Sequence, residues 1–512
     1  EYNNISLKSA LLDLIQNNDI SIIFPDSIPN RLITKSCSNC TNDEAISRLL
    51  SSTELKWEKA KSQYIITLPI SEFEYSISGR ILDLQSDEPI AYANVFIPKL
   101  LIGDISRDDG VFSIPNITSK SCTLVISYIG YNTKKIPLLL PKDQSKFQSI
   151  YLLPKILISK EISITSSSRE FMDRSNNPGQ VSFSPRHIAT LPNLGEVDIF
   201  RSLQFLPGIQ LGLGGTSDLY IRGGSPDQNL IILDGMPIYT TGHMFGFISG
   251  ISANAIKDIQ IYKGSIPAKY GGRISSVIEL KSRAGNNSKI HGSFYGNLIS
   301  QGLSLELPLF NRANWIINYR KSMPSINLSN LYKSIQEYVT GDDKFNILTK
   351  TAEDQNTQNA DYDINSSYQD IISRITFLLN PHHRFTLTHM NSIDSIMETR
   401  TYFGFNSIFS EDITNINEKT DLENRGTVLN WSSHWNHLFS THITLSIYDI
   451  ASNYFAIQEN LHSLFEEKNI FSDHQATFTN QYKGIKNHNI SSGIVQSNLN
   501  IGFNNHIEDR SI

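Results

Sequence analysis

Three groups of residues have side chains and spacings that could do chemistry. The first is Cys37-Ser38-Asn39-Cys40, a CxxC pair of the kind found in redox motifs, zinc sites and local disulfides. A zinc site needs further ligands, and the 3 Cys of the chain form no second pair. We therefore expect an incidental pair or a local disulfide of Cys37 with Cys40, rather than a redox centre.

The second group is His434-Trp435-Asn436-His437, which has HxxH spacing. On a strand, residues i and i+3 point to opposite faces, so we do not expect the two imidazoles to share a metal ion. The third group is Asp104, Asp108 and Asp109, whose carboxylates could bind calcium. Acidic residues followed by glycine are typical of a β-turn, and we prefer that interpretation.

Motifs of nucleophilic, phosphate-binding and metallopeptidase chemistry do not occur in the sequence. It contains no HExxH, no P-loop and no nucleophile elbow. We expect a protein that is not an enzyme, with no catalytic residue, no cofactor and no metal site. The 44 basic and 50 acidic residues give a formal net charge of -6, and without a basic excess we expect no nucleic-acid partner.

Length and composition limit the elements that can position these residues. The chain has 512 residues, enough for three or four domains of roughly 150 residues each. No run approaches 18 apolar residues, so we expect no transmembrane helix. Membrane-spanning strands are not excluded, because their apolar residues alternate with polar ones.

The first two segments differ in their periodicity. Residues 1–70 predict a small α/β domain, because two runs with helical spacing are each followed by a strand-like run at residues 20–24 and 64–68. Thr41 and Glu44 have the spacing of a capping box that begins the second helix. Residues 75–153 contain short strand-like runs between turn signals and predict a β-sandwich, followed by a linker at 154–184.

Residues 185–285 predict a compact α/β unit with many turns. Of the 29 Gly in the chain, 14 lie between Gly208 and Gly285, which favours tight turns and close backbone approaches. A helix is expected near residues 194–206. Short strands are expected within residues 219–223, 229–235, 256–264 and 275–282.

Residues 286–512 alternate polar and apolar positions in segments of roughly ten residues, the first of which we place at 293–300. The separators are short at residues 380–381 and 439–440, and long at about 323–365 and 392–424. Short turns on one side, long loops on the other and aromatic residues near the segment ends are typical of an outer-membrane β-barrel. A large soluble β-sandwich is the alternative that the alternation leaves open.

The order of these pieces resembles a TonB-dependent outer-membrane receptor of the Bacteroidetes type. Residues 1–70 are similar to the secretin and TonB N-terminal domain, and residues 75–153 to the carboxypeptidase-regulatory-like domain, through Gly79-Arg80, 93–95, 109–112 and 127–131. Residues 185–285 resemble the plug domain. The plug motifs, in order, are LPG at 206–208, YIRGG at 220–224, ILDGMP at 232–237, IKDI at 256–259, YKG at 262–264 and YGGR at 270–273.

The resemblance implies a mixed multidomain fold that ends in an antiparallel transmembrane β-barrel. A family barrel has about 22 strands and needs on the order of 440 residues, so we expect residues 286–512 to be the N-terminal half of it and the chain to be a fragment. The protein is then expected in the outer membrane of a Gram-negative bacterium, in contact with outer-membrane lipid and with residues 1–184 in the periplasm.

The resemblance also implies roles for individual residues. Glu161-Ile162-Ser163-Ile164-Thr165 is the candidate TonB box, a strand that pairs with TonB, and an ordinary linker strand is the alternative. Residues of the turn motifs are expected to hold the plug in place through polar contacts and backbone geometry: Arg222, Gly223, Gly224, Asp234, Gly235, Tyr270, Gly271, Gly272 and Arg273. Tyr239, His243 and Phe245 lie in a segment that either faces the solute or packs against the barrel.

The implied function is import of a scarce solute by energy-coupled displacement of the plug. TonB, with its inner-membrane energising proteins, is the implied partner, and a lipoprotein lid is a further candidate. One alternative is a signal-transducing receptor whose N-terminal domain acts on an anti-sigma regulator. Another is a surface β-protein that transports nothing.

Overall fold

The computed structural model divides into two compact units, Glu1–Glu74 and Tyr75–Ile512, each of which is described by itself. The residues it describes are 2–18, 20–25, 28, 32–53, 55–60, 63–67, 75–140, 147–155, 172–174, 180–183, 197–212, 218–246, 248–286, 289–323, 361–407, 410–458, 463–485 and 488–509. None of the helices in these ranges is long and apolar enough to span a membrane.

The N-terminal unit is a small α/β domain with its own core. Strands β2 (Ser21–Ile23), β5 (Gln63–Thr67) and β4 (Lys56–Ala60) form one sheet, and β1 (Tyr2–Ser6) pairs with β3 (Leu32–Lys35). Helix α1 (Leu7–Asn18) buries Leu7, Ala10, Leu11 and Leu14, the residues at helical spacing. The unit therefore folds around its own core, whose described buried residues run from Leu7 to Ile66.

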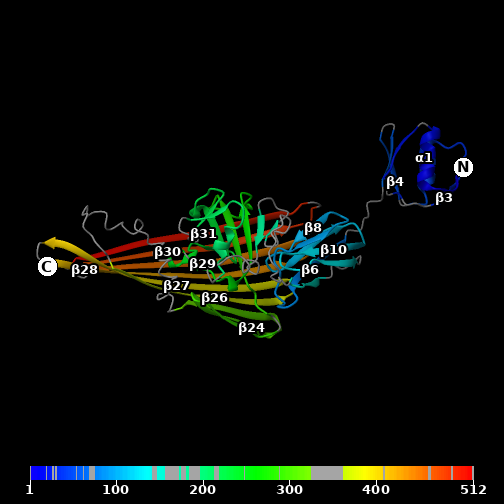
Figure 1. Cartoon of the computed structure of the whole chain (residues 1–512). Coiled ribbons are helices and arrows are strands. Elements are labelled where there is room, and N and C mark those ends of the chain that lie inside the picture. Colours follow the sequence, from blue (N-terminus) through cyan, green and yellow to red (C-terminus); the bar gives the residue numbers. More distant parts are fainter. Residues whose placement is uncertain are drawn as a thin grey trace, which may run out of the picture. The chain divides into compact units, whose positions relative to one another are not determined.

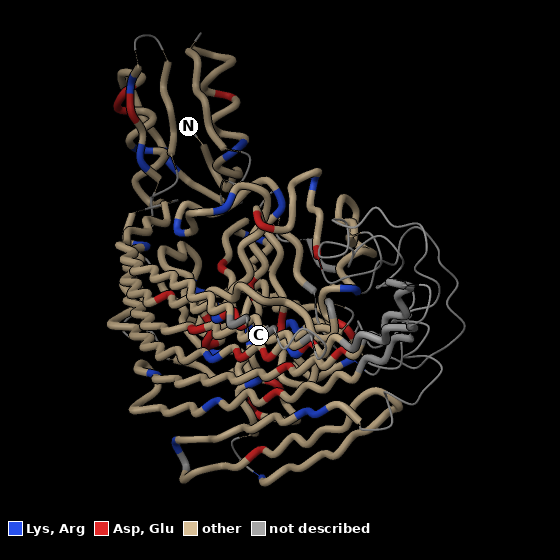
Figure 2. The backbone as a smooth tube through the Cα atoms, turned by 90° about the vertical axis from the view of Figure 1, so that its left-hand side faces the viewer, with Lys and Arg blue, Asp and Glu red and all other residues tan. Residues whose placement is uncertain are grey.

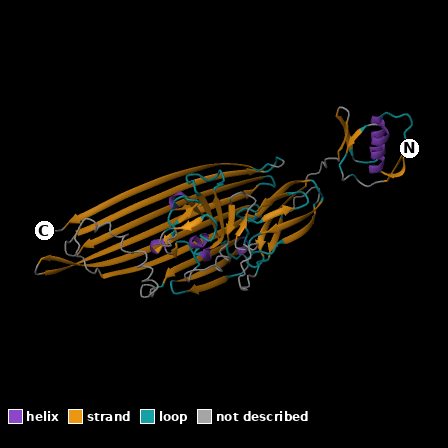
Figure 3. Ribbon diagram, turned by 45° about the horizontal axis from the view of Figure 1, so that its top comes forward, coloured by secondary structure: helices purple, strands orange, loops and turns teal. Residues whose placement is uncertain are grey.

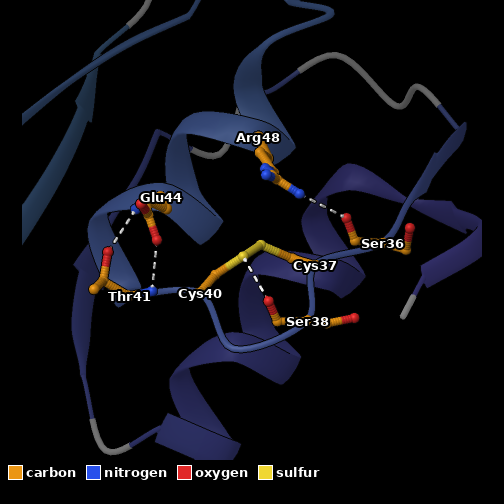
Figure 4. Close-up of a disulfide and its surroundings, with 7 residues drawn as sticks. All are labelled: Ser36, Cys37, Ser38, Cys40, Thr41, Glu44 and Arg48. Carbon is orange, nitrogen blue, oxygen red and sulfur yellow. Dashed lines mark hydrogen bonds between the residues drawn. A yellow bond between two sulfur atoms is a disulfide. The ribbon is translucent and has the colours of Figure 1, made fainter.

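The second helix of this unit, α2 (Asn42–Leu50), begins where the capping box predicts. Thr41 N donates to Glu44 Oε2 at 2.9 Å, and Glu44 N donates to Thr41 Oγ1 at 3.3 Å, so the prediction is confirmed. Directly before the cap, Cys37 and Cys40 form a disulfide with their Cα atoms 5.9 Å apart (Figure 4). The local disulfide, one of the two alternatives, is the one observed.

Residues 75–152 form the predicted β-sandwich. One sheet has the order β11 (Lys134–Leu139), β10 (Ser121–Ser127), β7 (Asn94–Ile97) and β8 (Ile102–Ile105). The other has the order β12 (Gln148–Leu152), β6 (Tyr75–Asp83) and β9 (Val111–Ile117). Gly110 N donates to Arg107 O at 2.8 Å, which confirms a β-turn at Asp108 and Asp109.

The third region is a compact α/β domain, which we call the plug. Its main sheet has the order β13 (Met172–Arg174), β14 (Gln180–Phe183), β21 (Ile256–Lys263), β22 (Ser276–Ser282), β17 (Asn229–Leu233) and β18 (Met236–Ile238). Shorter elements are α4 (Ile199–Leu203), β15 (Ile209–Leu211), β16 (Leu219–Ile221), η1 (Pro226–Gln228), β19 (Gly242–His243), η2 (Met244–Gly246), β20 (Ile248–Ser249) and η3 (Ala253–Ala255). The helix is shorter than expected, and residues 184–196 lie outside the described part.

The last region is a nine-stranded antiparallel sheet in sequence order (Figure 1, Figure 3). Its strands are β23 (His291–Gly296), β24 (Ser300–Leu309), β25 (Ala313–Ser322), β26 (Asp361–Asn380), β27 (His383–Ser407), β28 (Ser410–His434), β29 (Phe439–Gln458), β30 (Ser463–Tyr482) and β31 (Ile490–Asp509), with η4 (Phe310–Arg312) before β25. The fold class is confirmed: a small α/β domain, a sandwich, an α/β plug and a large antiparallel sheet.

The two faces of this sheet differ in chemistry. Met390 in β27, Val428 in β28 and Tyr448 in β29 belong to the plug core, and we call their side of the sheet the inner face. Neighbouring residues along each strand point to the outer face, because side chains alternate. Large apolar side chains remain more than a third exposed on the outer face: Leu303, Tyr319, Ile375, Phe377, Leu387, Leu429, Leu445, Ile447, Ile470 and Phe478.

Three expectations for the sheet are wrong. Residues 439–440 are not a separator, because they begin β29 and pair with Tyr482 and Gln481. Residues 392–424 are not a long loop, because β27 and β28 stay paired along most of this range. Polar residues occupy both faces of this hairpin, so no apolar alternation marks it, while backbone pairing is independent of the side chains. Residues 293–300 are not one segment, because Asn297 Oδ1 accepts from Ile299 N and Ser300 N at 2.7 Å and closes a turn between β23 and β24.

Candidate functional site

The turn between β17 and β18 fixes the plug to three strands of the sheet through Asp234. Asp234 has a φ of 50°, is 4% exposed, and its Oδ1 accepts from Ser282 N at 3.0 Å within the plug. From the sheet, Thr388 Oγ1 donates to Asp234 Oδ2 at 2.8 Å, and Arg374 NH1 lies 3.5 Å from Oδ1. Asn430 Nδ2 donates to the Asp234 carbonyl at 2.9 Å. Burial raises the pKa of Asp234, but nearby cations, Arg374 first, outweigh it and hold the pKa below its usual value.

A second contact places His243 of the plug between two carboxylates of the sheet. His243 Nδ1 lies 2.8 Å from both oxygens of Asp394, and Nε2 lies 2.8 and 3.0 Å from the two oxygens of Asp370. The imidazole stacks on Tyr368 at 4.3 Å between ring centroids. Arg320 Nε donates to Asp370 at 2.8 Å, and Arg320 NH2 donates to the Ser249 carbonyl of the plug at 2.7 Å.

These four ionisable groups balance in charge only when His243 is protonated. Asp370 and Asp394 are negative, Arg320 is positive, and all three side chains are buried with the imidazole. Burial lowers the pKa of His243, but the two carboxylates outweigh it and raise the pKa to about 9. A buried charge without a partner is costly, so the cluster favours the imidazolium at neutral pH.

Tyr239 makes the third contact between the plug and the inner face. Its hydroxyl donates to Asp473 Oδ2 in β30 at 2.6 Å, and its ring lies 4.5 Å from Phe471 and 5.8 Å from Tyr448. Burial, with the carboxylate of Asp473, raises the pKa of the Tyr239 hydroxyl. Tyr239 and His243 therefore both pack against the sheet. Phe245 lies in η2, and its side chain is outside the described part.

Most of the other predicted plug residues contact the plug itself, whereas a β-carbon at Gly235 would lie 3.0 Å from Thr444 of the sheet. Arg222 is exposed, has a φ of 51°, and its guanidinium lies over Gly264 of the plug. Tyr270 donates to Glu279 Oε2 at 2.8 Å, and Arg273 NH1 donates to the Gly272 carbonyl at 2.9 Å. Gly223, Gly235 and Gly272 have φ of 81°, 99° and 78°. A β-carbon at Gly224 would collide with Ser275, whereas one at Gly271 would meet nothing.

The sandwich contacts the turns that join the sheet strands in pairs. Lys483, directly after β30, lies 2.6 Å from Asp104 Oδ1. His434, at the end of β28, places Nε2 2.7 Å from Asp109 Oδ2 and Nδ1 2.8 Å from Arg107 NH1. The acidic residues predicted only as turn formers therefore also hold two domains together. Figure 1 shows β6, β8 and β10 of the sandwich at this end of the long strands.

The sandwich also contacts the plug through charged side chains. Glu88 lies 2.9 Å from Lys257 Nζ and 3.8 Å from Arg283 Nε, and it accepts from Gly285 N at 2.6 Å. Burial raises the pKa of Glu88, but the two cations outweigh it and lower the pKa to about 2. Lys281 lies 3.7 Å from Asp108. Figure 2 marks the acidic and basic residues along the backbone, where the two signs are interspersed.

Sandwich, plug and sheet meet at a cavity of about 30 Å³, large enough for one or two water molecules. Charged side chains from all three regions line it: Asp108, Asp234, Asp258, Lys281, Arg374 and Arg384. Burial raises the pKa of Asp258 to about 6, and Tyr128 of the sandwich donates a hydrogen bond to this carboxyl group. In the described part of the chain, no three His, Cys, Asp or Glu side chains are arranged to hold a metal ion.

Reasoning from the sequence did not find the sheet residues of these contacts. Arg320, Asp370 and Asp394 are charged residues at inner-face positions of long strands, where Asp370 pairs in register with Arg320. A charged residue at such a position is the one signal that could have found them. The candidate TonB box, residues 161–165, lies outside the described residues.

Two protein-family models match the sequence. Residues 77–164 match the CarboxypepD_reg-like domain, a range that includes the first four residues of the candidate TonB box. Residues 183–277 match the TonB-dependent Receptor Plug Domain. The chain contains a TonB-dependent receptor plug domain. This plug domain is the α/β domain whose Asp234, Tyr239 and His243 contact the sheet.

Solved structures of siderophore receptors resemble the chain at low identity. A mutant ferric enterobactin receptor PfeA of Pseudomonas aeruginosa is 13% identical over 65% of this chain and 60% of its own, with a TM-score of 0.34. FpvA of P. aeruginosa, bound to a heterologous pyoverdine, is 11% identical over 99% and 67%, with a TM-score of 0.35. PirA of Acinetobacter baumannii is 14% identical over 63% and 58%, with a TM-score of 0.30. The chain thus spans about three fifths of the PfeA structure. No curated protein sequence matches the chain significantly.

Proposed function

We propose that the chain is part of a TonB-dependent receptor that imports a scarce solute across an outer membrane. The observation that carries this proposal is a plug domain packed by its core on one face of a nine-stranded sheet whose other face exposes large apolar side chains. Sheet residues Ile372, Met390, Val428 and Tyr448 share the plug core. A domain seated in this way occupies the inner side of the sheet, where a solute would have to pass.

The outer face supports a position in lipid. Leu387, Leu445 and Ile447 are 41%, 47% and 48% exposed, although burying a side chain of this size stabilises a protein by about 1.5–3 kcal/mol. Lipid tails supply that burial for alternate residues of a membrane strand. At the turn end, Trp431 lies 6.2 Å from Phe385 and 6.1 Å from Trp435 between ring centroids, which fits an aromatic girdle at the membrane interface.

Coupling to TonB is proposed for residues 161–165. Strand addition uses backbone hydrogen bonds, and the alternating Ile162 and Ile164 favour an extended strand. Ile162→Pro removes a backbone donor and should abolish capture of the purified periplasmic domain of TonB by the full chain. Ser168→Pro, outside the box, is the matched control and should leave capture unchanged.

The result that contradicts coupling is equal capture by wild type and by Ile162→Pro, or recovery of the chain outside the outer-membrane fraction of its cell. Equal capture with correct fractionation would favour a surface protein that transports nothing. Loss of capture in both proline variants would place the TonB contact elsewhere in the linker.

A second candidate function is signalling through the N-terminal unit. The observation that favours it is the separate core of residues 2–67, which allows this unit to bind a partner without the rest of the chain. Deleting residues 1–70 should then abolish gene induction through an anti-sigma regulator and leave uptake intact. Unchanged induction after the deletion contradicts the signalling function.

A further inference from the structure

The sandwich and the plug differ in how their apolar cores relate to the sheet. Every buried residue of the sandwich core lies between Tyr75 and Leu152. The plug core, by contrast, contains Ile372, Met390, Val428 and Tyr448 of the sheet. Removing the plug from the sheet therefore opens an apolar core, whereas removing the sandwich leaves its core closed.

Polar and charged contacts hold the sandwich on the surface of the plug and the sheet that it covers, which we call its seat. Four of its ionisable residues, Glu88, Asp104, Asp108 and Asp109, pair with groups of the plug or the sheet. Other contacts go to backbone carbonyls: Arg80 NH2 donates to Pro381 O at 3.1 Å, and Ser113 Oγ donates to His437 O at 2.5 Å. One ring contact joins Phe147 to His382 at 5.4 Å between centroids.

Polar contacts of this kind hold two domains less firmly than a shared apolar core. Desolvation of a buried ion pair offsets most of its Coulomb attraction, and that cost is recovered when both charges return to water. Apolar burial has no such compensation, because exposing the same area to water is always unfavourable. The net free energy that holds the sandwich is therefore small compared with the net free energy that holds the plug.

We propose that residues 75–152 are a releasable domain, which leaves its seat on the plug and the sheet as a folded unit while the plug stays in place. Release uncovers Lys257, Lys281 and Asp258 on the turn side of the plug. Sandwich release would then precede movement of the plug in an import cycle, a consequence that rests on the proposed function. Release itself involves neither solute nor TonB, so its test is independent of that function.

Ser113→Cys tests release in the full chain, held in detergent micelles. Ser113 is 5% exposed at the seat, so the introduced thiol reacts with a maleimide-polyethylene glycol reagent only when the sandwich leaves. Native Cys122, 6% exposed in the sandwich core, reports unfolding of the sandwich instead. Thr388→Cys, fully buried beneath Asp234, reports departure of the plug.

Removing a charged side chain from the sheet should favour release of the sandwich without changing the sequence of the sandwich itself. Lys483→Met leaves the partly buried carboxylate of Asp104, 13% exposed, without its cation, and should raise the labelling rate of the Ser113→Cys thiol by about 100-fold. Lys419→Met removes an exposed pair with Asp421, whose side chains are 43% and 39% exposed, and should leave that rate unchanged.

The expected pattern is rapid labelling at position 113, with Cys122 and the Thr388→Cys thiol protected. Equal labelling at 113 and 388 would overturn the proposal, because the two domains would then leave together. Labelling of Cys122 alongside position 113 would overturn it as well, because the sandwich would unfold rather than release. If position 113 is not labelled even in Lys483→Met, the sandwich does not leave the plug and the sheet, and the proposal is wrong.

Discussion

The plug and the sandwich lie against the same sheet but are held there by different forces. The plug shares an apolar core with Met390, Val428 and Tyr448 and adds buried charges to it. The described core of the sandwich consists of sandwich residues alone, and the domain contacts the sheet through Asp104, Asp109 and their partners. Charges occur at both seats, so it is the apolar contact that distinguishes a fixed domain from a releasable one.

Breaking the buried charge cluster of His243, Asp370, Asp394 and Arg320 tests the surface of the sheet that holds the plug, the plug seat, most strongly. Arg320→Met removes one of the two cations around Asp370 and should lower the free energy of unfolding by about 3–5 kcal/mol. Arg425→Met removes an exposed pair with Glu423 and should change it by less than about 1 kcal/mol. Thermal or denaturant unfolding measures both variants, and equal effects would show that the cluster does not stabilise the plug seat.

Alkaline pH should weaken the same seat through His243. Its pKa is about 9 in the folded protein against about 6.5 when unfolded, so its contribution, on the order of 3 kcal/mol, is complete below pH 6.5 and is lost as the pH rises through 9. The labelling rate of the Thr388→Cys thiol, divided by that of the denatured chain at the same pH to remove the effect of thiol ionisation, should increase over that range. A His243→Gln variant should lose this pH dependence. If labelling of the variant depends on pH in the same way as labelling of the wild type, His243 is not the group responsible.

Acid should weaken the sandwich seat through Glu88. The pKa of Glu88 is about 2 in the folded protein, below its unfolded value, so its contribution is present above about pH 4.5 and is lost as the pH falls toward 2. Release at pH 3, taken as the labelling rate of the Ser113→Cys thiol divided by that of the denatured chain at the same pH, should exceed release at pH 7 by about tenfold. Glu88→Gln should release the sandwich rapidly at both pH 3 and pH 7. If release of the wild-type sandwich does not change with pH, Glu88 does not hold it in place.

The smallest expected effect lies in the N-terminal unit and leaves both seats unchanged. Thr41→Ala removes one half of the capping box and should lower the free energy of unfolding of this unit by about 1 kcal/mol. Thr41→Ser keeps the hydroxyl and should restore most of that loss. Altered labelling at position 113 or 388 in Thr41→Ala would show that the N-terminal unit is coupled to the seats.

Local pattern was sufficient for much of the fold. The spacing of Leu7, Ala10 and Leu11 predicted α1, and Thr41 with Glu44 predicted the start of α2. The strand runs at 229–235 and 256–264 became β17 and β21. The hairpin of β27 and β28 was missed because its polar residues carry no alternating signal, although its backbone pairs as fully as that of any other strand.

The sequence by itself determined many of the elements, because helix caps, turns and alternating apolar residues act over a few neighbouring positions. It also carried the plug motifs, which the family model matches at residues 183–277. Only the tertiary structure decided that His243 meets Asp370 and Asp394, and that Asp109 meets His434, pairs separated by more than 100 residues. A buried charge is paired by whichever side chain the fold brings within about 4 Å, and separation along the sequence does not encode that distance.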